Sequence, residues 1–141
     1  MHNFKFIDHT ADIAVDVSGD SLEELFTASA EALVKSITGN FSPAEPVLRD
    51  LTITAESREE LLVEFLNELN YLAEVKKLIF VDAVRVEISE KDNIFELTAE
   101  VKLTGLDPDY SPDNEIKAIT YHQMKIEYKD NVYSTRIVFD I

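Results

Sequence analysis

The sequence predicts an α+β fold in which two amphipathic helices pack on one face of a largely antiparallel β-sheet. Three observations support this class. Two segments with the hydrophobic period of a helix each follow a serine that can cap the helix. Segments in which polarity alternates, as in strands, lie before and after these two helices. Polar tripeptides join the later strands into hairpins. The 141 residues contain no internal repeat and no linker rich in proline or serine, so we expect a single domain over residues 1–141.

The N-terminal segment predicts two short strands with a polar loop between them. Large apolar residues alternate with Lys5 over 4–6 and with Ala14 and Asp16 over 13–17, which is typical of strands with one buried face. The sequence between them, Asp8-His9-Thr10-Ala11-Asp12, is polar. We therefore expect it to form a loop or the end of a strand.

Each predicted helix begins at a serine that a glutamate follows three residues later, in the pairs Ser21 with Glu24 and Ser57 with Glu60. This spacing is the capping-box pattern of helix starts. Apolar residues then recur at helical spacing over Leu22–Ile37, before Gly39, and over a second helix up to about Ala73, with a short strand predicted over 51–55. We expect the core to contain Leu25, Phe26, Leu33, Leu62, Phe65, Leu66, Leu69, Val86, Leu97 and Val101.

The second half of the chain predicts two hairpins separated by an acidic loop over Gly105–Glu115. The tripeptides Lys91-Asp92-Asn93 and Lys129-Asp130-Asn131 provide the two turns, since Asp and Asn tolerate turn conformations. The expected strands are 84–88 and 95–103 in the first hairpin, and Ile116–Tyr128 and Val132–Ile141 in the second.

The composition excludes several classes of protein. The formal net charge of −15 repels phosphate backbones, so we do not expect strong direct binding of nucleic acid. The absence of cysteine excludes disulfides, thiolate metal sites and cysteine nucleophiles. No stretch approaches the roughly 20 apolar residues of a membrane span, and the N-terminus does not resemble a signal peptide. We expect a cytoplasmic protein without a membrane segment.

Two parts of the chain concentrate potential metal ligands. Asp8, His9 and Asp12 place two carboxylates and an imidazole within five residues, a set that suits Mg²⁺, Ca²⁺ or Mn²⁺ better than zinc. Asp and His also form turns and cap strands, so a purely structural role is the alternative. Of the later histidines, His122 is expected to be a packed or edge residue, and His9 is the better metal candidate.

The second concentration of charge lies at the C-terminus. Strand alternation puts Asp140 on the face of Val138 and Val132, where a carboxylate needs a partner. The α-carboxylate of Ile141 follows directly, and two unit charges about 4 Å apart repel by roughly 4 kcal/mol at an effective dielectric constant of about 20. Either the two groups point apart at a frayed, solvated terminus or a cation holds them together.

Lys117 is one of few basic residues and stands where the acidic loop meets the next predicted strand. A lysine in this position forms either a salt bridge or a contact with a phosphate group.

Taken together, these motifs resemble the archease family over essentially the whole chain. The segments that carry the resemblance are Asp8-His9-Thr10-Ala11-Asp12, Gly19 with Ser21–Phe26, Gly105-Leu106-Asp107, Ile116–His122 and Arg136–Ile141. Two positions depart from the family pattern. Residues 109–113 lack the His-Glu pair that many relatives carry before the lysine, so no histidine ligand is expected there. Gln123 replaces a residue that is often small in relatives, which affects the partner surface and not the expected ligands.

The resemblance implies a small acidic protein that is not itself an enzyme. It implies a cofactor of the guanylylating RNA ligase of tRNA splicing and RNA repair, which promotes guanylylation and multiple turnover and meets GTP only within the ligase complex. It also implies a divalent metal site, for Ca, Mg or Mn, at Asp8, His9, Asp12, Asp140 and Ile141, the last through its terminal carboxylate. Lys117 would assist guanylylation of the partner.

Two other interpretations follow from the residues. One is a metal-dependent phosphohydrolase with Asp8, Asp12 and Asp140 as ligands and His9 as general base. The other is a generic acidic binding module or chaperone without a catalytic partner.

Overall fold

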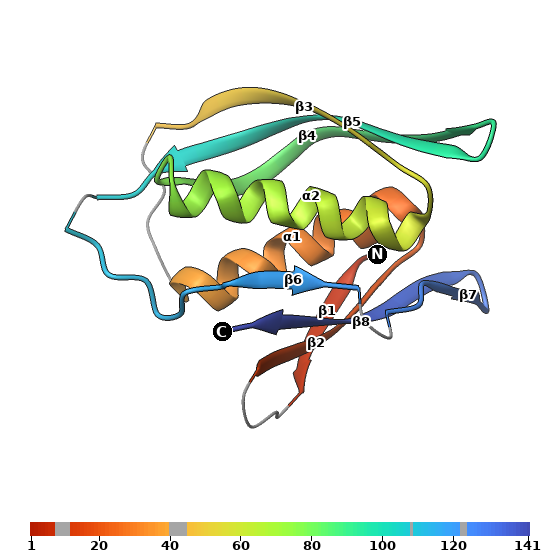
Figure 1. The fold of residues 1–141 in the computed structure, drawn as a ribbon, viewed down its shortest axis with the longest axis horizontal. Helices are drawn as coiled ribbons and strands as arrows, with labels where there is room; N and C mark the ends of the chain where they lie inside the picture. Colours follow the sequence, from red (N-terminus) through yellow and green to blue (C-terminus); the bar gives the residue numbers. More distant parts are fainter. Residues whose placement is uncertain (8–11, 40–44, 108, 122–123) are drawn as a thin grey trace.

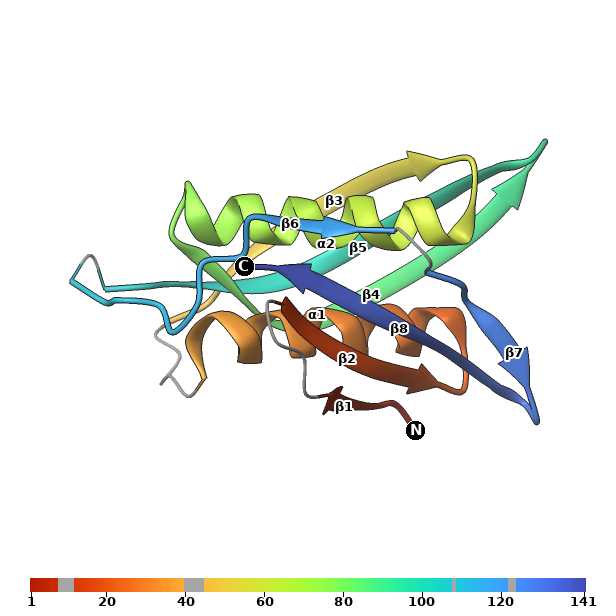
Figure 2. The same ribbon diagram turned by 60° about the horizontal axis from the view of Figure 1, so that its bottom comes forward.

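Two helices lie between two antiparallel β-sheets in the computed structural model, which gives the fold three layers (Figures 1 and 2). The structure describes residues 1–7, 12–39, 45–107, 109–121 and 124–141. Both sheets carry the helix layer on one face only (Figure 1). The predicted α+β class with antiparallel pairing and two helices is confirmed, whereas the division of the strands into two sheets was not visible in the sequence.

The larger sheet joins the two ends of the chain. It contains β1 (Asn3–Ile7), β2 (Asp12–Gly19), β6 (Ala118–Thr120), β7 (Glu127–Lys129) and β8 (Val132–Asp140). The strand order is β1-β2-β8-β6, and β7 also pairs with β8. The smaller sheet contains β3 (Val47–Ala55), β4 (Leu78–Lys91) and β5 (Ile94–Gly105) in the order β3-β5-β4. The last strand therefore lies inside the larger sheet, next to β2 (Figure 2).

The helices α1 (Leu22–Thr38) and α2 (Arg58–Glu74) begin at the predicted serines. The side chains of Ser21 and Ser57 accept hydrogen bonds from the N–H groups of the predicted glutamates, at 3.1 and 3.0 Å. These bonds satisfy N–H groups that have no partner within the helix. Gly39 ends α1 with a φ of 64°, a left-handed conformation that favours glycine. Among the residues that the structure describes, neither α1 nor α2 has the length and the apolar character that a membrane-spanning helix requires.

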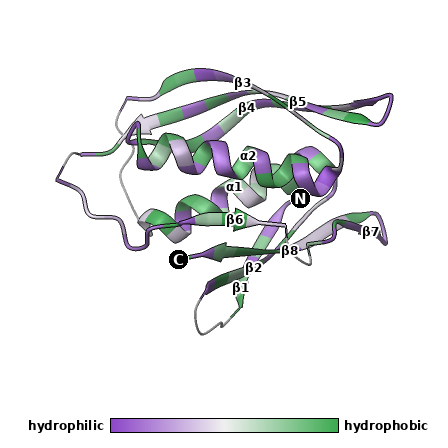
Figure 3. Ribbon diagram, in the orientation of Figure 1, coloured by the Kyte–Doolittle hydropathy of each residue, from purple (hydrophilic) through white to green (hydrophobic). Residues whose placement is uncertain are grey.

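The central position of the helices explains their sequence. Small residues Ala28, Ser29, Ala30 and Ala32 are all buried, so α1 is covered on more than one side. The hydropathy colouring shows apolar residues along much of α1, whereas apolar and hydrophilic residues alternate along α2 (Figure 3). The buried hydroxyl of Ser29 donates to the carbonyl of Leu25 at 2.8 Å, so it does not remain unsatisfied in the core.

The predicted core residues are buried with one exception. Val86 on β4 is only partly buried, although it packs against the core. The rings of Phe26 and Phe65 stack with their centroids 5.9 Å apart and join the two helices. The core prediction from helical spacing is thus confirmed at nearly every position.

The single strand predicted over Ile116–Tyr128 is wrong, because the structure divides it into β6 and β7. Both pair with β8, but in different registers. Thr120 lies opposite Val138, and Glu127 lies opposite Ser134. The stretch between Thr120 and Glu127 is longer than the stretch of β8 that it accompanies, so the ladder cannot continue. The N–H group of Met124 donates instead to the carbonyl of Tyr121, at 3.0 Å.

Two strands are longer than expected for physical reasons. β3 starts at Val47, but residues 47–50 are all exposed, so they show no alternation. β4 starts at Leu78, and its pairing with β5 shifts between Phe80 and Asp82 and again between Ala83 and Arg85. Each irregularity moves the inward-facing positions by one, which removes the period-two pattern from the sequence.

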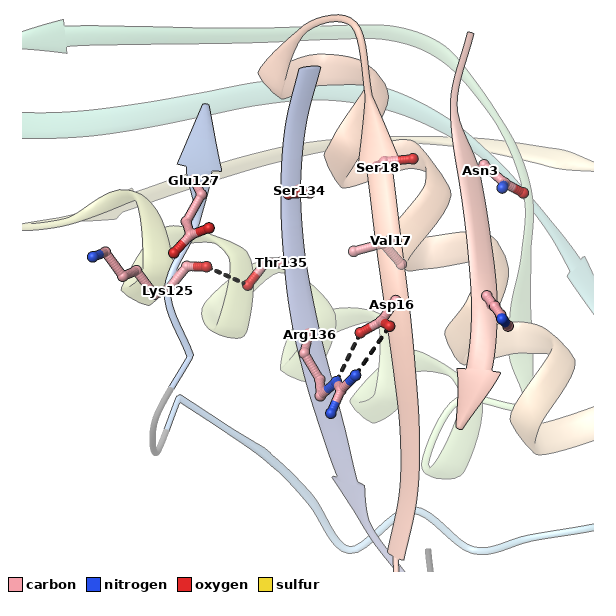
Figure 4. Close-up of a pocket in the computed structure, with 10 residues that line it drawn as sticks. Asn3, Asp16, Val17, Ser18, Lys125, Glu127, Ser134, Thr135 and Arg136 are labelled. Carbon is pink, nitrogen blue, oxygen red and sulfur yellow. Dashed lines mark hydrogen bonds and ion pairs between the residues drawn. The ribbon is translucent and has the colours of Figure 1, made fainter. Parts of the chain in front are cut away.

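A cross-strand ion pair joins β2 to β8 on the outer face of the larger sheet (Figure 4). Arg136 lies opposite Asp16, and its Nε donates to Oδ1 of that carboxylate at 2.8 Å. A second bond runs from Nη2 to Oδ2 at 3.1 Å. These bonds lower the pKa of Asp16, and the nearby charge of Lys5 adds to the effect.

We expect R136Q to be less stable than the parent at pH 7 but not at low pH. A carboxyl group with a lowered pKa in the folded state stabilises that state above its unfolded pKa. The contribution is lost as the pH falls through the folded pKa of Asp16. Urea unfolding of both proteins at neutral and acidic pH measures the difference in the free energy of unfolding. A difference that stays constant down to the acid limit would contradict this explanation.

Candidate metal and partner site

The pairing of β2 with β8 places Asp12 directly opposite Asp140. Asp12 is the first residue of β2 and Asp140 is the last residue of β8. Opposite residues of an antiparallel pair point to the same face, with Cβ atoms about 4.5 to 5.5 Å apart. Asp12 is half-buried and Asp140 is exposed. The structure therefore brings together two of the predicted ligands from opposite ends of the sequence.

The segment that contains Lys117 flanks Asp140 from the other side. Ala118 on β6 lies opposite Asp140, and the N–H group of Lys117 donates to the carbonyl of Asp140 at 2.8 Å. Ile141, which carries the terminal carboxylate, directly follows Asp140 and lies at the same end of the sheet (Figure 1). Two acidic side chains, the backbone of a lysine and the chain terminus thus meet at one end of the larger sheet.

Two asparagines of α2 hold the lysine segment in place. The amide of Asn67 both donates to the carbonyl of Ile119, at 3.3 Å, and accepts from its N–H group, at 3.2 Å. Asn70, which is buried, donates to the carbonyl of Ile116 at 2.8 Å. The backbone is therefore fixed on both sides of Lys117. Sequence reasoning missed these residues, although two asparagines within one turn of a helix are a detectable signal because Asn is a poor helix former.

The side chain of Lys117 remains exposed, while its neighbours Ile116 and Ile119 are buried. The part of the chain that the structure describes offers no ion pair to Lys117. Among the described residues Lys117 therefore has no salt-bridge partner, and the salt-bridge interpretation gains no support from them. An ammonium group on a fixed backbone is well placed to contact a ligand or partner.

The acidic loop is attached to the carboxyl end of α1. The hydroxyl of Tyr110 donates to the carbonyl of Thr38 at 2.7 Å. The side-chain amide of Asn114 donates to the carbonyl of Ser36 at 2.8 Å. The N–H group of Asp113 donates to the carbonyl of Ile37 at 2.7 Å. These carbonyls have no partners within the helix, so the loop satisfies them.

Both helices run in the same direction, so their carboxyl ends lie at the same end of the molecule as this loop and the C-terminus (Figures 1 and 2). The partial negative charges of the two helix dipoles therefore add at this end. Such a field favours a bound cation.

The prediction that Asp140 lies on an otherwise apolar face is wrong. The face that it shares with Val138 also carries Arg136, which is exposed, and it is the face of β8 that turns away from the helices. The buried face carries Thr135, Ile137 and Phe139 instead. Asp140 is thus a surface carboxylate at the end of the sheet and not one among apolar side chains. The remaining predictions for Asp8, His9 and His122 lie outside the described residues.

The donor set suits a hard divalent cation. Two carboxylates directly opposite each other on neighbouring strands repel, and a cation between them would relieve that repulsion. Among the described residues, no three His, Asp or Glu side chains are placed to hold a metal ion. Asp12 and Asp140 therefore form only part of the predicted ligand set, which also includes Asp8, His9 and the carboxylate of Ile141.

Comparison with known proteins gives one consistent family. The model of the Archease protein family (MTH1598/TM1083) matches residues 4–141. The archease of Pyrococcus furiosus is 38% identical over 143 residues, which cover 100% of both chains. Protein 1598 of Methanobacterium thermoautotrophicum has a similar solution structure, with a TM-score of 0.81, 31% identity and 98% of each chain covered. A crystal structure from Thermotoga maritima, described as an archease and possible chaperone, gives a TM-score of 0.59 at 28% identity, covering 97% of this chain and 96% of that one.

Proposed function

Because the chain belongs to the archease family, we propose that it is a metal-binding protein cofactor of a guanylylating RNA ligase that serves tRNA splicing and RNA repair. The observation that supports this proposal most directly is the register that sets Asp12 opposite Asp140 beside the backbone of Lys117. The cofactor would promote guanylylation and multiple turnover of the ligase in the cytoplasm.

The proposed metal is Ca²⁺, Mg²⁺ or Mn²⁺, held by Asp12, Asp140 and the carboxylate of Ile141 together with Asp8 and His9. A divalent cation supplies charge stabilisation for phosphate oxygens when it is bound. The carboxylates of this chain position the ion at an exposed end of the sheet, which a partner can reach.

Guanylylation develops negative charge on the phosphates of GTP. The ammonium group of Lys117 lies on a backbone that is fixed by Asn67, Asn70 and Asp140, so it can be held against a phosphate oxygen with little loss of backbone freedom. The bond-making steps would take place on the ligase, and the cofactor would contribute position and charge. This division explains how a protein with a net charge of −15 assists RNA joining without strong binding of RNA.

The direct test uses the purified protein, its host's RNA ligase, GTP and Mn²⁺. We expect faster guanylylation of the ligase and repeated rounds of RNA joining. The relative from Thermotoga maritima is described as a possible chaperone. A chaperone would raise the yield of folded ligase and leave the turnover of folded ligase unchanged. Hydrolysis of GTP by the isolated protein would indicate the phosphohydrolase interpretation instead.

K117A should lower the stimulation of the ligase and leave the melting temperature of the protein nearly unchanged. The reason is that the exposed ammonium group has no ion pair within the described residues, so the isolated fold does not depend on it. K129A is the matched control, because it removes an exposed lysine of β7. A large loss of stability with normal stimulation would contradict the proposed role of Lys117.

A further inference from the structure

A pocket of about 400 Å³ lies between the carboxyl ends of the helices and the acidic loop. Apolar side chains line it from both helices and from the loop, namely Ile37, Ala73, Leu106 and Ile116. Its charged lining residues, all exposed, are Glu74, Lys77, Asp107 and Glu115. The pocket thus combines an apolar floor with a charged rim.

The rim favours a positive ligand. It carries three carboxylates and one ammonium group. The negative ends of both helix dipoles lie at this end of the molecule and add to the same field (Figure 1).

The walls of the pocket are joined by hydrogen bonds. Asn70 bridges α2 to Ile116 at 2.8 Å. The N–H group of Leu106 donates to the carbonyl of Lys77 at 2.9 Å, which ties the end of β5 to the residues after α2. The hydroxyl of Tyr110 bridges the loop to α1. The pocket is therefore formed before any partner arrives, which reduces the entropic cost of binding.

We propose that this pocket receives a lysine or arginine side chain of the partner ligase. The inference rests on the proposed function and adds the place where the partner docks. A long basic side chain fits both parts of the pocket, because its aliphatic stem covers the apolar floor and its charged head reaches the acidic rim. A bare metal ion would leave the floor exposed to water, and an RNA phosphate would be repelled by the rim. Because Ile116 lines the pocket, a side chain bound there lies beside the segment of Lys117.

A second copy of the chain is a weaker candidate for the occupant. Each copy carries a net charge of −15, so two copies repel each other at neutral pH. A partner protein with exposed basic residues would instead be attracted to the acidic rim. Charge complementarity therefore selects a basic partner.

The first test compares two double variants with the same change in net charge. E74Q/E115Q removes two carboxylates of the rim, and E90Q/E96Q removes two exposed carboxylates of the β4–β5 hairpin. Isothermal titration with the ligase at low and at physiological salt should show about tenfold weaker binding for the rim variant, since each exposed ion pair contributes up to about fivefold in affinity. The hairpin variant should bind within about twofold of the parent. Equal binding by both variants would overturn the proposed pocket.

The second test locates the occupant. The chain has no cysteine, so E115C and E96C can each be labelled at a single position with a benzophenone maleimide and illuminated with the ligase. We expect a cross-link from position 115 to a ligase peptide that contains lysine or arginine, and none from position 96. A cross-link from 115 to a second copy of the chain, or none at all, would overturn the inference.

These outcomes can be distinguished from failure of the proposed function. If the parent protein neither binds nor stimulates the ligase, the proposed function fails. If the parent does both and the rim variant is unaffected, only the docking pocket fails.

Discussion

Adding a few Gly and Ser residues after Ile141 should weaken Mn²⁺ binding by about tenfold or more and remove stimulation of the ligase together with it. The extension converts the proposed carboxylate ligand into a neutral peptide carbonyl. It also places chain beside Asp12 and Asp140, which lie opposite each other at the same end of the sheet. The fold should survive, because β8 ends at Asp140 and the added residues follow it.

Calorimetric titration with Mn²⁺ measures the first effect, and the ligase assay measures the second. D140A and D12N should each weaken metal binding to a comparable extent. Combining D140A with the extension should have less than the sum of the two effects, because both act on one ion. D50A is the matched control, since it removes an exposed carboxylate from β3. If the extended protein binds Mn²⁺ as well as the parent, the terminal carboxylate is not a ligand.

The second large effect concerns the core between the sheets. L66A should lower the free energy of unfolding by about 2 to 5 kcal/mol, toward the upper part of that range. Leu66 is fully buried on α2, and layers of sheet on both sides of the helices limit the collapse of the cavity that the mutation leaves (Figure 1). Urea unfolding should show a lower midpoint with an unchanged slope.

Tyr71 on the same helix provides the control for L66A. Its side chain is 46% exposed, so Y71A should change the free energy of unfolding much less than L66A. An L66A variant with the midpoint of the parent would show that the core assignment is wrong.

The helices could be predicted because their signals are local. The Ser21 and Ser57 caps and Gly39 lie within one turn of the ends that they determine, and the apolar spacing between them follows the period of the helix. Strand partners depend on residues far apart, so the sequence showed most of the strands but not that they divide into two sheets. The same limit applies to β6 and β7, whose break follows from their register with β8.

The residues of the candidate site could likewise be predicted from local sequence, whereas their arrangement in space could not. Asp12, Lys117 and Asp140 could be chosen from the residues next to them in the sequence. Only strand pairing shows that Asp12 lies opposite Asp140. The support from Asn67 and Asn70 depends on helix α2 lying beside β6, which no local pattern contains. The exposed setting of Asp140 also follows from the tertiary fold, because the strand alternates equally well with either face turned inward.

The position of β8 inside the larger sheet also determines when this protein can fold during synthesis. The ribosome makes about 5 to 20 residues per second from the N-terminus, and elements usually fold as their partners emerge. Helices α1 and α2 and the smaller sheet are complete once Gly105 has emerged. The edge of β2 remains unpaired until residues 132–140 have been synthesised, more than a hundred residues later.

Contacts between such distant segments form slowly, because a long loop must close before they do. We therefore expect a nascent chain without β8 to expose the helix surface that Ile137 and Phe139 later cover. Pulse proteolysis of stalled nascent chains of increasing length should show protection of the larger sheet only when β8 has left the ribosome.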